Sequence, residues 1–235
     1  IEADWYTRDN YDLIGIINTQ GMGGQVSKFG NIASMKSGGV ELSLSTTNIS
    51  TKDFKWTTSF IYSHSQTKVT DLKTTTRMID LITGSGFAQE GYPVRGIFSI
   101  PFKGLNEQGL PTFLDQDGDI STTGIYFQES DPDKLKFLEY SGNADPTDVG
   151  SFGNIFEFYG FRFNLFLTYS FGNVIRLDPV FHSSYNDLDS MPREFKNRWS
   201  VPGDEKITNI PVIASVWQNR NDNQLSYAYN AYNYS

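Results

Sequence analysis

Residues 160–172, which read GFRFNLFLTYSFG, alternate between apolar and polar side chains. Six large apolar side chains share one side of the pattern: Phe161, Phe163, Leu165, Leu167, Tyr169 and Phe171. The other side is polar, with Phe166 as the exception. Because successive side chains of a β-strand point to opposite faces of the sheet, the pattern predicts a strand with one apolar and one polar face. Its length favours a tilted membrane-spanning strand of about 9 to 11 residues over a globular strand of about 5 or 6.

Further segments repeat this alternation. Residues 40–45 and 54–63 are separated by a short polar connection, which predicts an antiparallel hairpin. Residues 150–158 precede the first segment described, and the two are predicted to form a second hairpin that turns near Gly160. Residues 1–17 alternate more loosely and predict one more strand. The chain is therefore expected to consist of long antiparallel strands.

The composition agrees with an all-β protein. The 18 Phe and 13 Tyr residues favour strands, the 21 Gly residues favour turns, and long helical runs rich in Ala, Leu, Glu or Lys are missing. The sequence contains no cysteine, which excludes a disulfide scaffold and a cysteine nucleophile. A formal net charge of -8 argues against nucleic acid as a partner, since phosphate neutralisation requires a basic surface.

The spacing of the strands distinguishes two kinds of β protein. Roughly 80 residues lie between the two predicted hairpins, too many for an ordinary connection in a compact domain. Within them, residues 128–148 carry six acidic residues against two lysines. A sandwich normally has a turn every 8 to 12 residues or so, whereas a transmembrane barrel alternates short turns with long loops. The spacing therefore favours a barrel whose apolar strand faces contact lipid.

Four motifs, in this order, resemble the C-terminal half of the barrel of SusC/RagA-type TonB-dependent outer-membrane transporters. They are NIASMKSGGVELSLS at 31–45, GYPVRGIFSIPFKGLNEQGLPTFLDQDGD at 91–119, YGFRFNLFLTYSFGNVIR at 159–176 and NRWSVPGDEKITNIP at 197–211. The resemblance covers almost the whole chain. The resemblance implies an antiparallel transmembrane barrel of about 22 strands that a plug domain closes.

The resemblance also implies a function. Such a protein would be an active importer of oligosaccharides or peptides in the outer membrane of a Gram-negative bacterium. The TonB complex would supply its energy, and a SusD-like surface lipoprotein would cover its extracellular mouth. Residues 1–235 would form part of the barrel, without the plug domain or the final strands. Residues 64–149 and 173–235 would contain long extracellular loops, and no cofactor or catalytic residue is expected.

The segment DQDGD contains the one weak candidate for a metal site. Asp115, Asp117 and Asp119 have the spacing of the first three calcium ligands of an EF-hand loop. However, the sixth position is Ile120 rather than glycine, and the twelfth is Tyr126 rather than glutamate. These mismatches favour an acidic hairpin turn that holds no metal.

Four other titratable residues are interpreted as non-catalytic. Glu41 and Glu157 lie on the polar sides of their strands and could form a glycosidase pair, but carboxylates that line a barrel lumen are the preferred interpretation. His64 and His182 have no nucleophile or ligand pattern beside them, which favours positions in a loop or at the rim.

The aromatic residues suggest two roles. Those near the predicted strand ends are expected to form girdles at the membrane interfaces, namely Tyr6, Tyr62, Tyr159, Tyr169 and Phe171. Three in the loops could instead stack on a sugar: Phe127, Tyr140 and Trp199. The motif NRWSVPGDE predicts an ordered external loop, in which Pro202 and Gly203 form a turn.

Two alternatives to the importer stay open at this point. One is a soluble carbohydrate-binding β-sandwich, in which a second sheet would cover Phe163, Leu165 and Leu167. The other is a surface glycan hydrolase that uses Glu41 and Glu157.

Overall fold

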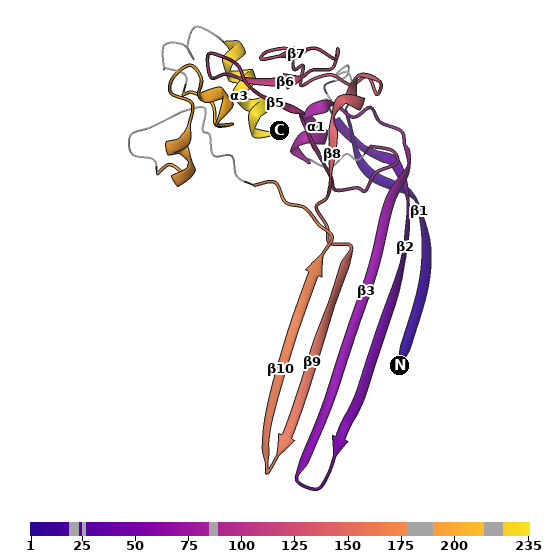
Figure 1. Cartoon of the computed structure of the whole chain (residues 1–235). Helices are drawn as coiled ribbons and strands as arrows, with labels where there is room; N and C mark the ends of the chain where they lie inside the picture. Colours follow the sequence, from indigo (N-terminus) through magenta and orange to yellow (C-terminus); the bar gives the residue numbers. More distant parts are fainter. Residues whose placement is uncertain (19–23, 25–26, 85–88, 178–189, 214–222) are drawn as a thin grey trace. The chain divides into compact units, whose positions relative to one another are not determined.

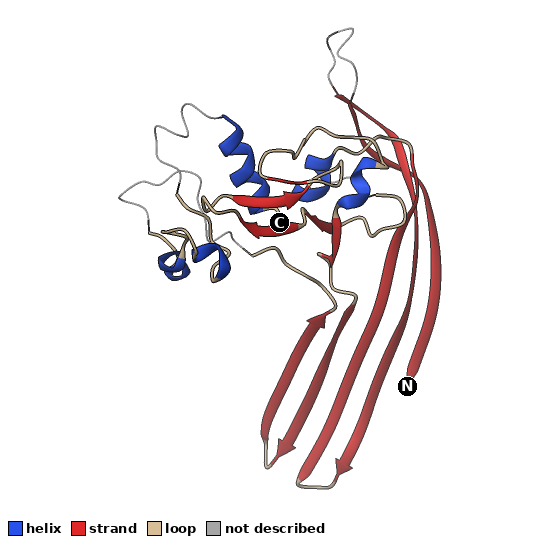
Figure 2. Cartoon of the chain, turned by 45° about the horizontal axis from the view of Figure 1, so that its top comes forward, coloured by secondary structure: helices blue, strands red, loops and turns tan. Residues whose placement is uncertain are grey.

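The computed structural model describes residues 1–18, 24, 27–84, 89–177, 190–213 and 223–235. The chain divides into two compact units. We call residues 1–74, 86–96 and 142–174 the sheet unit, and residues 75–85, 97–141 and 175–235 the loop unit. The described helices, blue in Figure 2, all belong to the loop unit. None of these helices is long and apolar enough to cross a membrane.

The sheet unit contains a five-stranded antiparallel sheet with the strand order β1-β2-β3-β9-β10 (Figure 1). Its strands are β1 (Glu2–Asn18), β2 (Ser27–Ser50), β3 (Phe54–Leu72), β9 (Asp148–Phe158) and β10 (Phe161–Phe171). The register confirms both predicted hairpins, β2-β3 and β9-β10. Strands β2 and β3 extend well beyond the alternating residues, so the sequence pattern identified only the part of each strand with unlike faces.

The turn between β9 and β10 consists of Tyr159 and Gly160. Their φ angles are 47° and 83°, so both residues have the left-handed backbone of a two-residue hairpin turn. Glycine adopts this conformation without a steric penalty, whereas tyrosine is strained in it. The turn therefore occurs at the predicted position, and a glycine is required there for a physical reason.

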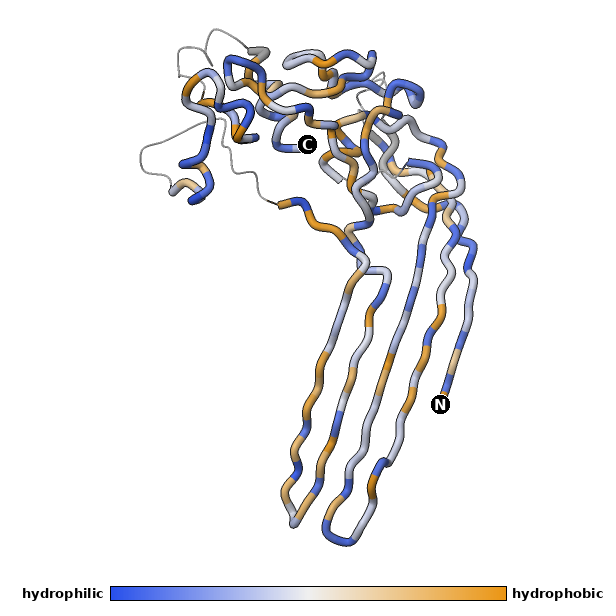
Figure 3. Tube along the Cα trace, viewed as in Figure 1, coloured by the Kyte–Doolittle hydropathy of each residue, from blue (hydrophilic) through white to orange (hydrophobic). Residues whose placement is uncertain are grey.

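Residues directly opposite each other on paired strands point to the same face, so the register defines two faces. Phe60, Phe152 and Leu167 lie opposite one another along β3, β9 and β10. The apolar face comprises Trp5, Val40, Leu42, Leu44, Phe54, Trp56, Phe60, Tyr62, Phe152, Phe156, Phe158, Phe161, Phe163, Leu165, Leu167, Tyr169 and Phe171. In Figure 3 the most hydrophobic residues are orange, and they recur along β9 and β10.

The apolar face is open. Phe163, Leu165 and Leu167 are 57%, 42% and 55% exposed, and among the described residues no second sheet covers them. A soluble sandwich would bury these side chains between two sheets. The sandwich alternative is therefore wrong for this part of the chain, and the prediction of long antiparallel strands with one exposed apolar face is confirmed.

Two aromatic side chains lie on the polar face, each beside a glycine of the next strand. The ring of Phe166 lies over Gly153, where an added Cβ would be 2.6 Å from Phe166 Cε1. Tyr6 lies over Gly39 in the same way. Aromatic rings of this kind cover the backbone that glycine leaves bare. Tyr6 was predicted to belong to an aromatic girdle, but it lies on the polar face, because the alternation places its neighbour Trp5 on the apolar face.

The seam between β3 and β9 differs from its neighbours, because no turn joins these strands. Residues 73–147 lie between them, so side chains must help to set the register. Asn154, which is 6% exposed, points to the apolar face. Its Oδ1 accepts hydrogen bonds from Trp56 Nε1 at 2.9 Å and from Thr58 Oγ1 at 2.8 Å. These bonds connect β9 to β3 through groups that would otherwise be unsatisfied on an apolar surface.

A second cluster connects the same two strands where their pairing ends. Asp148 Oδ1 accepts a hydrogen bond from Tyr62 Oη at 2.6 Å and lies 2.8 Å from His64 Nδ1. Thr147 Oγ1 donates to the other carboxylate oxygen at 2.7 Å. His64 therefore lies within β3, at the last residue pair between β3 and β9, and not in a loop as predicted. Its ring is held there by a carboxylate.

The loop unit consists of short elements around small cores. They are α1 (Met78–Thr83), β4 (Gly96–Ser99), β5 (Phe102–Leu105), β6 (Pro111–Leu114), β7 (Ile120–Ser121), η1 (Lys134–Phe137), β8 (Glu139–Asn143), η2 (Arg193–Asn197), η3 (Asp204–Lys206) and α3 (Asn223–Asn233). One core consists of Phe195, Leu225 and Tyr229, with partly buried hydrophobic side chains around it. Met78 and Phe113 are fully buried elsewhere in the unit. The long connections are thus folded structures with hydrophobic cores of their own.

We predict that Asn154→Ala destabilises the sheet. The substitution leaves the Trp56 indole N–H and the Thr58 hydroxyl without the acceptor that they share, which costs about 1–3 kcal/mol in a buried setting. Thermal unfolding of the folded protein in detergent measures the loss. Asn164→Ala is the matched control, because Asn164 is an exposed asparagine on the polar face of the adjacent strand. Equal melting temperatures for the two variants would contradict this role of Asn154.

Candidate functional site

The polar face of the sheet unit is lined mainly by small side chains. The middle of this face consists of Ser43, Ser45, Thr57, Ser59, Ser63, Ser151, Gly153, Thr168 and Ser170. Such residues provide hydroxyl groups but fill little space in front of the sheet. Apolar exceptions on this face are Ile61, Val149, Ile155 and Phe166, of which Ile61 and Phe166 are at least half exposed. This face can therefore line a wide, hydrated interior.

Carboxylates lie at two separate places on the polar face. Glu41 lies opposite Asp4 on β1 and Ser63 on β3. Glu157 lies opposite Lys55 on β3, and its Oε1 is 3.5 Å from Arg162 Nε. These charged residues lie on the same face as the hydroxyl groups described above.

The two glutamates are too far apart for glycoside hydrolysis. Their partners on β3, Ser63 and Lys55, are eight positions apart along the strand, which corresponds to about 26 Å. The catalytic carboxyl groups of glycosidases are about 5 to 9.5 Å apart. Glu41 and Glu157 therefore do not form a hydrolytic pair.

A hollow of about 430 Å³ lies between the two tight turns of the sheet unit. Its lining includes Lys52, Lys55, Glu157, Tyr159 and Arg162. Charged side chains of both signs face this space, so it is a polar rim rather than an apolar ligand pocket.

Asp115 organises the DQDGD turn of the loop unit. Its Oδ1 accepts hydrogen bonds from the backbone N–H groups of Asp117 and Asp119, at 3.1 and 3.0 Å. Its Oδ2 accepts one from Ser121 Oγ at 3.0 Å. Asp117 forms an ion pair with Lys134 at 3.1 Å. The three predicted carboxylates do not converge, and the described part of the chain has no cluster of His, Cys, Asp or Glu that could hold a metal ion.

The acidic segment 128–148 is folded onto its own backbone. The N–H groups of Asp131 and Ser130 hold the pKa of Glu129 below its usual value. Lys134 lies between Asp117 and Glu129, and Lys136 pairs with Asp133 at 2.6 Å. Part of the negative charge of this segment is thus engaged in hydrogen bonds and ion pairs that hold a turn.

The segment NRWSVPGDE forms an ordered loop, as predicted. Asp204 Oδ2 accepts hydrogen bonds from the N–H groups of Ser200 and Val201, at 2.9 and 3.0 Å. Glu205 Oε2 accepts from the Gly203 N–H at 2.7 Å and from Trp199 Nε1 at 3.2 Å. Its pKa is lowered mainly by its own and the Gly203 N–H group. Gly203 has a φ of 107°, which a side chain would strain.

This loop presents two apolar side chains to solvent. Val201 is 58% exposed and Ile207 is 84% exposed, although the backbone that carries them is held by the hydrogen bonds described above. We call these two residues the aliphatic knob. A rigid loop with exposed aliphatic groups loses little conformational entropy when a partner binds to it.

The predicted sugar-stacking residues have different surroundings. Phe127 is buried and stacks on Tyr227. The Trp199 ring packs against Gly109, and only Tyr140 of the three is well exposed. They do not form a common platform. His182 lies outside the described residues.

Comparisons with known proteins agree with these observations. No protein-family model matches the chain. It is 26% identical over 196 residues to TonB-dependent receptor P3 of Formosa agariphila, which covers 74% of this chain and 19% of that receptor. The chain thus spans about a fifth of the length of this relative.

Solved structures of the RagAB peptide importer have a similar fold. The closed-closed state matches with a TM-score of 0.66 and 22% identity, covering 91% of this chain and 24% of the other. The open-open state matches with a TM-score of 0.63 and 18% identity, covering 91% and 23%. The resemblance to SusC/RagA-type TonB-dependent transporters that the four motifs indicated is therefore confirmed, and the chain has the fold of a part of their antiparallel barrel.

Proposed function

We propose that this chain forms part of the wall of an outer-membrane barrel that imports peptides or oligosaccharides with energy from TonB. The observation that carries the proposal is the pair of unlike faces on one continuous sheet. One face presents large apolar side chains that no described layer covers, and the other presents hydroxyl groups. A barrel wall between lipid and a wet lumen requires this combination.

The dimensions of the apolar face support a membrane position. Strands β9 and β10 are paired over 11 residues from the tight turn to the loop end. With a rise of about 3.4 Å per residue and a tilt of about 40°, they extend about 26 Å along the membrane normal, close to the apolar band of about 25 Å in outer-membrane barrels. Aromatic side chains lie at both ends of this band, for example Phe158 and Phe161 at the turn and Tyr169 and Phe171 at the loop end.

The loop unit is proposed to face outward and to hold a SusD-like lipoprotein over the barrel. RagAB, which has the same fold in its barrel, is a peptide importer with open and closed states. The aliphatic knob provides a preorganised apolar contact of the kind on which protein interfaces depend. In this proposal the chain has no catalytic residue and no cofactor, because transport requires capture and passage rather than covalent chemistry.

We predict that Leu167→Arg impairs assembly of the complete transporter in the membrane, whereas Thr168→Arg does not. The two residues are consecutive, with Leu167 on the apolar face and Thr168 on the polar face. An arginine in mid-membrane on a lipid-facing position costs about 2–4 kcal/mol, and a lumen position carries no such cost. The yield of heat-modifiable folded protein in outer-membrane fractions measures the difference. Equal loss for both variants would exclude lipid as the neighbour of the apolar face.

Import itself is tested in cells that contain the complete transporter. Labelled di- to pentapeptides and oligosaccharides should accumulate only when both the transporter and TonB are present. Accumulation should stop when either gene is deleted, because a plugged barrel cannot open without energy from TonB. Uptake that persists without TonB would contradict the proposed mechanism, and absence of uptake of every peptide and oligosaccharide would contradict the substrate class.

The proposed lid contact has its own test. Val201→Asp combined with Ile207→Asp should reduce co-purification of the lipoprotein encoded with the transporter, because each substitution places a charge in an apolar contact. Ile120→Asp is the matched control, since Ile120 is an exposed aliphatic residue of the loop unit outside the knob. Co-purification that is unchanged in the double variant would remove the knob from the lid interface.

A further inference from the structure

The polar face of β1 holds an arginine over an aromatic ring. Tyr6 and Arg8 are two positions apart along the strand, so both side chains lie on this face. The guanidinium carbon of Arg8 is 4.8 Å from the centroid of the Tyr6 ring. The ring in turn lies over Gly39 of β2, where an added Cβ would be 2.8 Å from Tyr6 Oη. The Arg8 side chain is therefore oriented by a ring that is itself fixed, while Arg8 stays exposed.

Carboxylates lie on the same face, on the side of Tyr6 away from Arg8. Asp4 of β1 is directly opposite Glu41 of β2, and both residues are exposed. Both line a hollow of about 180 Å³, and Glu2 adds a further carboxylate to its lining. Like charges at directly opposite positions destabilise a pair of strands, so a cation bound in this hollow would offset that cost.

These carboxylates suit an organic cation better than a metal ion. Among the described residues, no group of three or more His, Cys, Asp or Glu side chains could hold a metal. An ammonium group has three donors and needs acceptors at hydrogen-bond distance, which carboxylates on two neighbouring strands can provide. The expected cation is therefore an ammonium group of a solute.

We call Asp4, Tyr6, Arg8 and Glu41 the charged strip. Hydroxyl groups lie beside it on the same face. They belong to β3 residues at the levels of Asp4, Tyr6 and Arg8, namely Ser63, Ser65 and Thr67. A hydroxyl group both donates and accepts hydrogen bonds, as the N–H and C=O groups of a peptide require. The face thus offers a negative end, a positive end and neutral polar groups beside them.

The distance between the two charged ends fits a short peptide. Asp4 and Arg8 are four positions apart, which corresponds to about 14 Å between their Cα atoms. The guanidinium group of Arg8 lies over the Tyr6 ring, which shortens the span between the charged groups. An extended tripeptide measures about 10 Å from its ammonium nitrogen to its carboxylate. A neutral oligosaccharide carries no groups that would use these two ends.

We propose that the charged strip binds a zwitterionic peptide, whose ammonium group lies between Asp4 and Glu41 and whose carboxylate pairs with Arg8. This inference rests on the proposed function, which places the polar face toward the lumen, and it selects peptides from the two solute classes named there. The planar guanidinium fork of Arg8 matches the two oxygens of a carboxylate.

The test measures binding to the purified complete transporter in detergent by calorimetry, without any requirement for transport. The probes are four forms of trialanine: unmodified, N-acetylated, C-terminally amidated, and blocked at both ends. The unmodified peptide should bind about tenfold or more tightly than either singly blocked form, as expected for the loss of one hydrogen bond to a charged group. The form that is blocked at both ends should bind most weakly.

Two substitutions assign each end of the peptide to its partner. Arg8→Gln should abolish the effect of amidation and preserve the effect of acetylation. Glu41→Gln should reduce the effect of acetylation and preserve the effect of amidation. A purely structural role of either residue would weaken the binding of all four probes equally, so this pattern separates recognition from folding.

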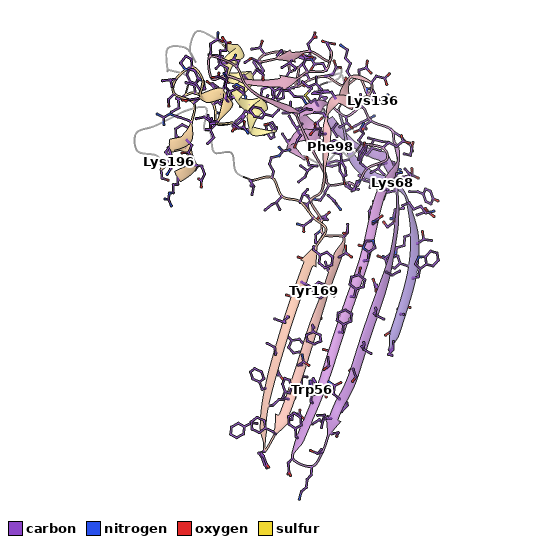
Figure 4. The ribbon with its side chains drawn as sticks, in the orientation of Figure 1. Trp56, Lys68, Phe98, Lys136, Tyr169 and Lys196 are labelled. Carbon is purple, nitrogen blue, oxygen red and sulfur yellow. The ribbon has the colours of Figure 1, made fainter. Side chains whose placement is uncertain are left out.

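Two control variants remove charges from the other face of the same strands. Asp9 directly follows Arg8 on β1, and Lys68 directly follows Thr67 on β3, so both point to the opposite face (Lys68 is labelled in Figure 4). Asp9→Asn and Lys68→Gln should leave the affinity ratios of the four probes unchanged.

Several results would overturn the inference. They are equal wild-type affinity for the four probes, absence of binding by all of them, an Arg8→Gln variant that keeps the effect of amidation, and a control variant that changes the ratios as Arg8→Gln does. Failure of the proposed function has a different signature, because TonB-dependent accumulation in cells would be absent whatever the probes show in detergent.

Discussion

The register between β3 and β9 is the constraint on which the sheet depends. A slip of one residue would move every apolar side chain of β9 and β10 to the polar face, because the side-chain period of a strand is two. The neighbouring seams β2-β3 and β9-β10 are closed by short turns, but residues 73–147 separate β3 from β9. Asn154, near the middle of the seam, and Asp148, at its end, both accept hydrogen bonds from β3 side chains. Side-chain polarity thus specifies a pairing that the short turns leave unspecified.

The sequence predicted the sheet well because strand periodicity is a local property. Both hairpins, the turn at Gly160 and the apolar face follow from alternation and glycine chemistry alone. Tyr6 was predicted to join an aromatic girdle, but the alternation of residues 1–17 is loose, and only the pairing with Gly39 shows that Tyr6 lies on the polar face. The role of Phe166 could not be predicted for the same reason, since Gly153 lies on another strand.

The loop unit was predictable only in part. Helix α3 has the sequence NQLSYAYNAYN, in which tyrosine and asparagine are poor helix formers. It is stabilised by tertiary packing, since Tyr229, Ala228 and Ala231 are almost completely buried. No local pattern reveals such packing. The ordered loop around Gly203, by contrast, was predicted from its turn residues, although the hydrogen bonds of Asp204 and Glu205 were not.

Carboxylates that accept backbone hydrogen bonds are the recurrent device of the loop unit. Asp115, Glu129, Asp204 and Glu205 each accept from N–H groups within a few residues, which fixes turns that have little hydrophobic core. Within segment 128–148, ion pairs with Lys134, Lys136 and Arg95 already compensate part of the negative charge, so this charge is weak support for an electrostatic docking surface. Binding of a partner by the loop unit is better assigned to exposed side chains that do not take part in its own folding. They include the exposed aliphatic side chains of the knob, which suit an apolar contact.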